Sequence, residues 1–311
     1  ILHSKVTPAT LEKSESFYLK VPPDHASAPR DTSNTVMLIE RMQRADAFAA
    51  SAAKSCSEPL ALLINRVVRS FRHGGRLIYI GAGTSGRLGV LDASECSPTF
   101  GVSPEQVIGI MAGGDRALRD SVEGAEDDAD LGRADIAKID PPIGKDDVVV
   151  GIAASGTTPY TLAAIAAAKE RGASTALVCC NPNATAEVDY LLILPTGPEV
   201  LPGSTRLKAG TATKMILNTI TTGAMVRLGK AYGNLMVDLR ATNEKLRDRA
   251  ERLVMLTCGI AREDARSAIT AAGGSVKLAI TMQKLGVDRA SAESRLAAEG
   301  GVIRRVVSGA P

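Results

Sequence analysis

The sequence predicts an α/β fold in which a parallel sheet is sandwiched by helices, with N-terminal helices before it and a small helical module after it. Short apolar runs rich in β-branched residues alternate with helical patterns through the middle of the chain, as in parallel sheets. The preceding segment has apolar residues at helical spacing, and the last segment holds short helical patterns separated by glycine-containing breaks. We expect three parts: residues 1–72 as an arm and covering helices, 73–242 as the sheet domain, and 243–311 as the helical module.

Each element follows from a local pattern. Residues 1–33, rich in serine, proline and charge, are expected to form an extended arm, and 35–71 to form two helices that cover the sheet. A long helix is expected at about 207–228. The five expected strands are 77–80, 107–111, 148–153, 174–179 and 190–194. The four short C-terminal helices are expected at 244–256, 261–271, 276–285 and 289–298.

Composition argues against several classes of protein. The 311 residues are 45% hydrophobic, enough for a large core, while a net charge of +3 and 3% aromatic residues without tryptophan argue against a nucleic-acid partner. Five scattered cysteines without a C-x-x-C pair, and three isolated histidines, fit a reducing compartment and argue against a metal site. No apolar run approaches the roughly 18 residues of a membrane helix, and we expect neither a membrane partner nor a signal peptide.

The first candidate site is a glycine-rich turn between a strand and a helix. The strand 77–80 ends at Gly81, and Thr84 and Ser85 follow before a helical pattern that starts at Arg87. Backbone N–H groups and the helix dipole at such a turn attract anions, and the two hydroxyls add hydrogen bonds. The turn therefore predicts an anion site.

Two alternatives remain for this turn. Gly81, Gly83 and Gly86 fit the G-x-G-x-x-G pattern of dinucleotide-binding proteins. Dinucleotide binding would require an acidic residue about 20 residues on, at the end of the next strand. The expected strand 107–111 is instead followed by Ala-Gly-Gly, and the first acidic residue after it is Asp115. The other alternative is that the glycines only make a tight turn.

A second strand–Ser-Gly–helix unit favours the anion site. Gly151 follows Gly81 by 70 residues (151 − 81 = 70), and Ser155-Gly156 follows Ser85-Gly86 by the same interval. Two such units in one sheet bring two hydroxyl-bearing loops to the edge where α/β sheets bind ligands. Neither loop has the lysine of a P-loop, which argues for a monophosphate over a nucleoside triphosphate. The second loop reads Ala154-Ser155-Gly156-Thr157-Thr158-Pro159.

Two glutamates are candidate acid–base groups. Glu95 follows the first loop closely enough for us to expect that it reaches the bound ligand. Glu123 follows the second strand, on the expected binding edge. Two carboxylates can divide the work of donating and removing a proton if their environments differ. The charges at 126–128 are expected to be a solvated helix end.

At these residues the sequence resembles the N-acetylmuramic acid 6-phosphate etherases, over about residues 74–306. The resemblance is specific because several blocks occur in the family's order. They are Gly-Ala-Gly-Thr-Ser-Gly-Arg-Leu-Gly at 81–89, Asp-Ala-Ser-Glu-Cys at 92–96, Val-Glu-Gly-Ala-Glu-Asp at 122–127, Gly-Ile-Ala-Ala-Ser-Gly at 151–156, Gly-Pro-Glu-Val at 197–200, Leu-Lys-Ala-Gly-Thr-Ala at 207–212 and Gly-Asn-Leu-Met-Val-Asp at 233–238.

The resemblance implies a sugar isomerase (SIS) fold and cleavage of the D-lactyl ether of N-acetylmuramate 6-phosphate, giving N-acetylglucosamine 6-phosphate and D-lactate. It also implies a homodimer in the bacterial cytoplasm, active in cell-wall sugar recycling without metal or organic cofactor. Glu95 matches the family's catalytic acid and Glu123 its base. Lys208 is either a phosphate ligand or a solvated first-turn lysine. The expected substrate and phosphate ligands are Gly83, Thr84, Ser85, Ser155, Thr157, Thr158 and Lys208.

Some features depart from the family or leave alternatives. Thr157 stands where the family commonly has arginine, and the family's N-terminal motif is visible only as residues 11–15. The segment 258–265 resembles the entry to a ubiquitin-associated (UBA-like) three-helix module. A non-catalytic sugar-phosphate sensor, like the related glucokinase regulatory protein, and a sugar-phosphate isomerase are the alternative functions.

Overall fold

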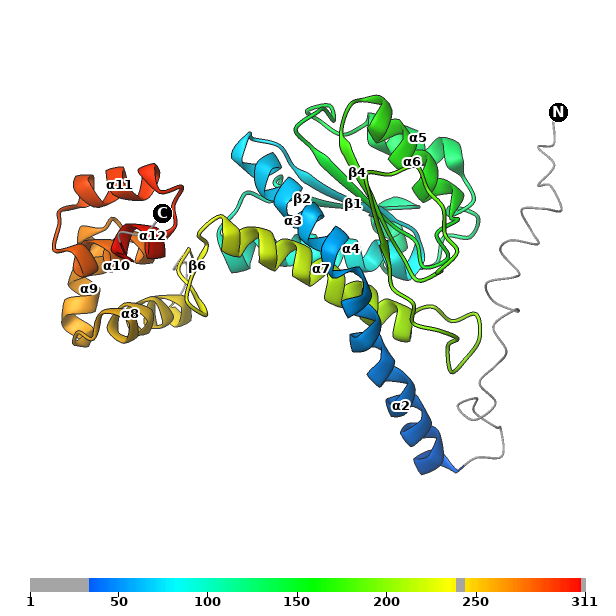
Figure 1. Ribbon diagram of the computed structural model, residues 1–311, viewed down its shortest axis with the longest axis horizontal. Coiled ribbons are helices and arrows are strands. Elements are labelled where there is room, and N and C mark those ends of the chain that lie inside the picture. Colours follow the sequence, from blue (N-terminus) through cyan, green and yellow to red (C-terminus); the bar gives the residue numbers. More distant parts are fainter. Residues whose placement is uncertain (1–33, 239–243, 309–311) are drawn as a thin grey trace. The chain divides into compact units, whose positions relative to one another are not determined.

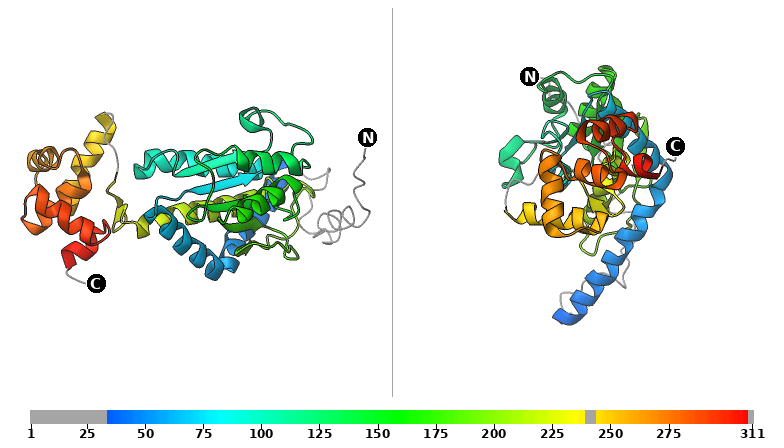
Figure 2. Two further views of the ribbon diagram at one scale, coloured as in Figure 1. Left: turned by 90° about the horizontal axis from the view of Figure 1, so that it is seen from above. Right: turned by 90° about the vertical axis from the view of Figure 1, so that its left-hand side faces the viewer.

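The computed structural model describes residues 34–238 and 244–308, which Figures 1 and 2 show as ribbons. The chain forms two compact units: the first comprises residues up to 93 together with 105–220, and the second comprises 94–104 and 221 onward. The extended arm expected at 1–33 lies outside the described residues. The division of the chain expected at residue 243 stays a prediction.

The first unit is built on a five-stranded sheet in the order β2-β1-β3-β4-β5, in which all neighbouring strands are parallel. The two central strands β1 and β3 are buried along their whole length because helices cover both faces. All five strands lie where the sequence predicts them, to within one residue at their ends. Their bounds are β1 Leu77–Gly81, β2 Val107–Met111, β3 Val148–Ile152, β4 Ser174–Cys179 and β5 Tyr190–Ile193.

Successive side chains of β1 point to opposite faces of the sheet, so different helices cover each face. Ile80 packs with Tyr160 of α6 in one core cluster. On the other face, the Tyr79 hydroxyl donates to the carbonyl of Leu217 in α7 at 3.5 Å. Figures 1 and 2 show helices on both sides of the strands. The helices are α2 Thr35–Ala53, η1 Lys54–Cys56, α3 Ser57–Arg72, α4 Gly83–Phe100, η2 Gly114–Leu118, α5 Ala129–Ala137, α6 Pro159–Glu170 and α7 Lys208–Arg227.

Of the two helices expected to cover the sheet, only α3 does so. α3 buries Leu63 and Val67 and packs against β5 and β3. α2 extends away from the sheet in Figure 1, and it leaves Val36 and Phe48 63% exposed. The prediction is wrong for α2 because its buried residues are all alanines, which are too small to form a broad apolar contact.

The second unit contains a hairpin and five short helices around their own core. Val254, Ala279 and Ile280 are fully buried in it. The Asp238 carboxylate forms ion pairs with Lys230 at 3.0 Å and Lys277 at 3.1 Å. The sequence predicted four of the helices but neither the hairpin nor the last helix, and the UBA-like character of the module stays a prediction. The elements are β6 Ala231–Tyr232, β7 Leu235–Met236, α8 Glu244–Cys258, α9 Arg262–Ala271, α10 Val276–Leu285, α11 Arg289–Ala298 and α12 Ile303–Ser308.

Candidate active site

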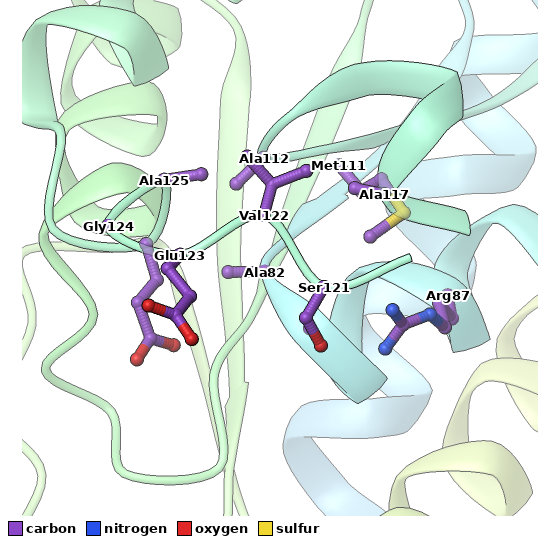
Figure 3. A pocket seen from close by; sticks show the side chains of 12 residues that line it. Ala82, Arg87, Met111, Ala112, Ala117, Ser121, Val122, Glu123, Gly124 and Ala125 are labelled. Carbon is purple, nitrogen blue, oxygen red and sulfur yellow. The ribbon is translucent and has the colours of Figure 1, made fainter. Parts of the chain in front are cut away.

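The carboxyl ends of β1, β2 and β3 meet along one edge of the sheet, which we call the carboxyl edge. Gly81, the last residue of β1, is in register with Met111 of β2 and with Ile152 of β3. Ligands bind at this edge in open α/β sheets. A pocket of about 290 Å³ lies here (Figure 3). It is lined by Ala82, Gly83, Arg87, Met111, Ala112, Ala117, Ser121, Val122, Glu123, Gly124, Ala125 and Glu126.

Three glycines allow α4 to begin directly at the end of β1. A Cβ atom at Gly86 would lie 2.6 Å from the carbonyl oxygen of Gly81, and Gly83 has a φ of +54°, so both positions favour glycine. α4 begins at Gly83, four residues earlier than the sequence predicted. Thr84 and Ser85 therefore lie in the first turn of the helix, where unpaired backbone N–H groups and hydroxyls together suit an anion.

The second hydroxyl loop joins β3 to α6. The Ser155 Oγ accepts hydrogen bonds from the backbone N–H of Thr157 at 3.2 Å and from its hydroxyl at 3.1 Å. Because both contacts use oxygen lone pairs, the hydroxyl proton of Ser155 stays available for a ligand. Thr158 is the N-cap of α6, and its side chain makes no capping hydrogen bond. The loop leaves the strand next to β1, but its residues do not line the pocket in Figure 3.

A third helix, α7, begins beside the first loop. A Cβ atom at Gly210 would lie 3.7 Å from Cγ2 of Thr84. The carboxylate of Glu199 accepts hydrogen bonds from the first two backbone N–H groups of α7, both at 3.0 Å, so this helix N-terminus already holds an anion. Lys208 is only 6% exposed, and its Nζ lies 5.9 Å from the centroid of the Phe48 ring. The alternative of a solvated lysine is therefore wrong, and the phosphate contact of Lys208 stays a prediction.

Glu123 lines the pocket, and so does a second carboxylate. Gly124, with a φ of +74°, turns the chain after Glu123, and Glu126 lines the same pocket three residues later. The carbonyl of Glu126 accepts a hydrogen bond from the backbone N–H of Tyr160 at 3.0 Å, which ties this turn to the start of α6. Glu126 is exposed, as expected of a solvated residue, but its place in the pocket lining was not predicted. The glycine between two glutamates was the available signal.

Arg87 is a pocket residue that the sequence analysis did not single out. Figure 3 shows Arg87 and Ser121 at one side of the pocket and Glu123 at the other. The Arg87 Nε donates to the carbonyl of Leu118 at 3.2 Å. The pocket therefore has a cationic side and an acidic side.

Glu95 lies in the same helix as the first loop but well beyond it. Ten residues separate it from Ser85, which corresponds to about 15 Å along α4 at the usual helical rise. Glu95 is exposed, and the lining of the pocket does not include it. This separation is larger than the sequence analysis assumed, because α4 starts early and continues to Phe100. The pairing of Glu95 with Glu123 stays a prediction.

Other reactive groups near this edge have different roles. Burial raises the pKa of the Cys179 thiol to about 12 and that of Cys180 to about 11, so both are protonated at neutral pH and suited to packing. Within residues 34–238 and 244–308, no three His, Cys, Asp or Glu side chains are grouped as metal ligands would be. None of the helices in those ranges is long and apolar enough to cross a membrane.

Two protein-family models match parts of this chain, and both describe SIS domains. Residues 130–223 match the family model of the SIS domain, and residues 59–169 match the model of the glucokinase regulatory protein N-terminal SIS domain. The SIS fold expected from the sequence is confirmed by the first match and by the parallel sheet with helices on both faces.

The chain is also similar over most of its length to curated bacterial proteins. Three of them carry the name N-acetylmuramic acid 6-phosphate etherase. The protein from Rubrobacter xylanophilus is 51% identical, covering 84% of this chain and 87% of that protein. The one from Deinococcus radiodurans is 48% identical over 93% and 94% of the two chains. The one from Cutibacterium acnes is 50% identical over 91% and 93%.

Proposed function

Because the chain belongs to the family of N-acetylmuramic acid 6-phosphate etherases, we propose how its residues cleave the D-lactyl ether of N-acetylmuramate 6-phosphate. The enzyme converts this substrate to N-acetylglucosamine 6-phosphate and D-lactate in cell-wall sugar recycling. The observation that carries the residue assignments is the position of Glu123 in a pocket at the carboxyl edge, next to the first turn of α4.

The phosphate binds at the two hydroxyl loops. Thr84 and Ser85 offer hydroxyls beside the free N–H groups at the start of α4. Ser155 and Thr158 offer hydroxyls at the end of the neighbouring strand. Lys208 supplies a cation where α7 begins, close to Thr84. These contacts hold the sugar so that its C2–C3 bond faces the carboxylates, which is the orientation effect that raises the rate.

Two proton transfers cleave the ether of the open-chain sugar. Glu123 removes the C2 proton, which the C1 aldehyde acidifies. The electron pair of that bond forms the C2–C3 double bond, the bond from C3 to the ether oxygen breaks, and Glu95 protonates the departing oxygen to give D-lactate. Water then adds its hydroxyl to C3 and a proton to C2. Each positioned acid or base contributes about 10²–10⁴-fold to the rate.

The distance of Glu95 from the loop along its own helix favours delivery of this residue by a second copy of the chain. About 15 Å separates Glu95 from Ser85 along α4, which exceeds the reach of a glutamate side chain. In the homodimer implied by the family, an exposed Glu95 on one copy is free to enter the pocket of the other. No disulfide joins the cysteines of the described residues, which fits the expected location in the cytoplasm.

Two measurements test this proposal. Purified enzyme should release D-lactate from N-acetylmuramate 6-phosphate, and Glu95→Gln and Glu123→Gln should each abolish most of this release. In dimers that combine one copy of each variant, one of the two sites regains both glutamates if Glu95 crosses between copies, so lactate release returns. If Glu95 acts within its own chain, mixed dimers stay inactive. Absence of lactate release by the unaltered enzyme would reject the activity itself.

The sensor alternative has one observation in its favour, the match of residues 59–169 to the regulatory-protein model. A sensor would bind N-acetylmuramate 6-phosphate and leave it intact, and an isomerase would interconvert sugar phosphates without releasing lactate. The lactate assay separates both from an etherase. Similarity to etherases over most of the chain, together with Glu123 in the pocket, favours the etherase.

A further inference from the structure

We propose that Arg87, assisted by Ser121, binds the lactyl carboxylate of the substrate and so selects substrates in which this carboxylate is free. The proposal deepens the proposed function and rests on it. The substrate has two anionic groups, its phosphate and its lactyl carboxylate, and the two hydroxyl loops account for the first of them.

Arg87 is partly buried as a residue, and its guanidinium lacks an acidic partner among the described residues. Its Nε donates to the carbonyl of Leu118 at 3.2 Å, and among the described residues no carboxylate forms an ion pair with it. A guanidinium has five N–H donors, so four remain, and the two terminal nitrogens form the fork that binds a carboxylate through two parallel hydrogen bonds. A guanidinium that lines a pocket without a counter-ion is suited to bind an anionic ligand there.

Arg87 is also the single cation among the twelve residues that line this pocket. The hydroxyl loops at 84–85 and 155–158 contain no lysine or arginine. Ser121 lies beside Arg87 in Figure 3 and adds a hydroxyl donor to the same side. An anion that needs a guanidinium in this pocket must therefore bind on the side of Arg87.

The position of Glu123 sets the orientation of the substrate. Glu123 lies across the pocket from Arg87 in Figure 3, and a pocket of about 290 Å³ is only about 8 Å across if it is taken as a sphere. In the substrate, the ether oxygen is bonded to C3, and the lactyl carboxylate carbon is two bonds away from this oxygen. C3 is the neighbour of C2, the carbon that Glu123 deprotonates. Repulsion between the two carboxylates directs the lactyl group away from Glu123 and toward Arg87. Recognition and proton abstraction thus fit in one pocket.

The experiment measures binding in a Glu123→Gln background, so that turnover is not needed. The ligands are N-acetylmuramate 6-phosphate, its lactyl carboxamide analogue, and N-acetylglucosamine 6-phosphate, which keeps the phosphate and lacks the lactyl group. Adding Arg87→Ala should weaken binding of the first ligand about 10- to 100-fold, the usual effect of losing hydrogen bonds to a charged group. Binding of the other two ligands should change less than about threefold, within the scatter of a neutral contact.

Controls separate recognition from structure. Arg119→Ala removes a positive charge from an exposed position in the loop that carries Ser121, outside the pocket lining, and should leave all three affinities unchanged. Arg87→Lys keeps the charge, loses the fork, and should give an intermediate affinity for the free carboxylate. Unchanged binding of N-acetylglucosamine 6-phosphate by Arg87→Ala shows that the site is folded.

Two outcomes would overturn the proposal. If Arg87→Ala weakens the binding of all three ligands equally, the guanidinium binds the phosphate or supports the segment around Leu118. If Arg87→Ala retains the preference for the free carboxylate over the carboxamide, another residue recognises the lactyl group. Failure of the proposed function is recognised separately, because the unaltered enzyme would then release no lactate.

Discussion

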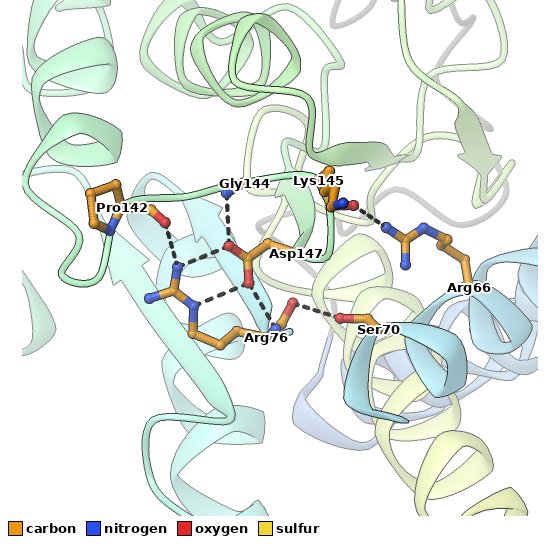
Figure 4. Close-up of polar contacts among 7 residues, drawn as sticks. All are labelled: Arg66, Ser70, Arg76, Pro142, Gly144, Lys145 and Asp147. Carbon is orange, nitrogen blue, oxygen red and sulfur yellow. Dashed lines mark hydrogen bonds and ion pairs between the residues drawn. The ribbon is translucent and has the colours of Figure 1, made fainter. Parts of the chain in front are cut away.

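The two edges of the central sheet use the same chemical groups in opposite ways. At the amino edge, where β1 and β3 begin, Asp147 and Arg76 form a buried ion pair at 2.9 Å (Figure 4). The Asp147 carboxylate accepts four hydrogen bonds, from the backbone N–H, Nε and a terminal nitrogen of Arg76 and from the backbone N–H of Gly144. At the carboxyl edge, Arg87 and Glu123 line one pocket and form no ion pair with each other.

The difference suggests that the charged groups of the amino edge stabilise the fold, whereas those of the carboxyl edge are available to a ligand. A buried carboxylate with four donors fastens two strands and a loop to each other. Burial alone raises the pKa of Asp147, but hydrogen bonds from Arg76 and Gly144 outweigh it and keep the pKa below the usual value. At the carboxyl edge, the guanidinium of Arg87 has no ion-pair partner and the hydroxyl proton of Ser155 is not donated within the loop, and we propose that both groups bind the substrate.

The largest effect is expected for Glu123→Gln at the carboxyl edge. Glutamine keeps the shape of the side chain but cannot take up the C2 proton, so kcat for lactate release should fall by about 10²–10⁴-fold. The matched control is Asp127→Asn, which removes a charge from the same turn outside the pocket lining and should keep kcat. Equal losses in both variants would mean that the charge of the turn matters, and the position of Glu123 in the pocket does not.

Asp147→Ala should act on stability. It leaves the buried guanidinium of Arg76 without its counter-ion, and removal of one partner of a buried pair costs about 3–5 kcal/mol. Denaturant unfolding measures the loss, and lactate release at low temperature should show that the folded fraction keeps its kcat/KM. A loss of kcat/KM without a loss of stability would contradict the division between the two edges.

Two serines compare the edges directly. Ser155→Ala removes a hydroxyl expected to bind the phosphate, and KM should rise roughly tenfold or more with little change in kcat, because hydrogen bonds to charged groups contribute about 1.5–3 kcal/mol. Ser70→Ala removes a buried hydroxyl that donates to the Arg76 carbonyl at 3.4 Å, and should cost about 1 kcal/mol of stability with KM unchanged. Steady-state kinetics and denaturant unfolding of both variants test the contrast, and a KM effect at Ser70 would break it.

The smallest expected effect is the loss of folding stability at low pH. Since the folded-state pKa of Asp147 is lowered, its contribution to stability is present above its unfolded pKa, near 3.8, and is lost as pH falls through the folded value. The free energy of unfolding should therefore drop on acidification below about pH 4 more steeply for the unaltered protein than for Asp147→Asn. If the free energy of unfolding had the same pH dependence in the two proteins, the Asp147 carboxylate would have the same pKa in the folded and unfolded states.

The sheet could be predicted from the sequence because its strands depend on local composition. The run Val148–Ile152 holds four β-branched residues and one glycine and no polar side chain, which is typical of a buried parallel strand. The position of Glu123 at the carboxyl edge followed from the end of the preceding strand. The course of α2 could not be predicted in this way, because helical spacing shows that a helix forms but does not show what covers its apolar face.

The sequence alone predicted the alternation of strands and helices, the two hydroxyl loops after β1 and β3, and the position of Glu123 at the carboxyl edge. Its resemblance to known proteins indicated the family. Only the tertiary structure decided that α4 starts at Gly83, that Glu126 and Arg87 share a pocket with Glu123, and that Lys208 is buried against Phe48. The physical reason is range. Strand and helix formation depends on residues a few positions apart, whereas the partner of a charged side chain is set by which segments the fold brings together, as with Arg76 and Asp147, 71 residues apart.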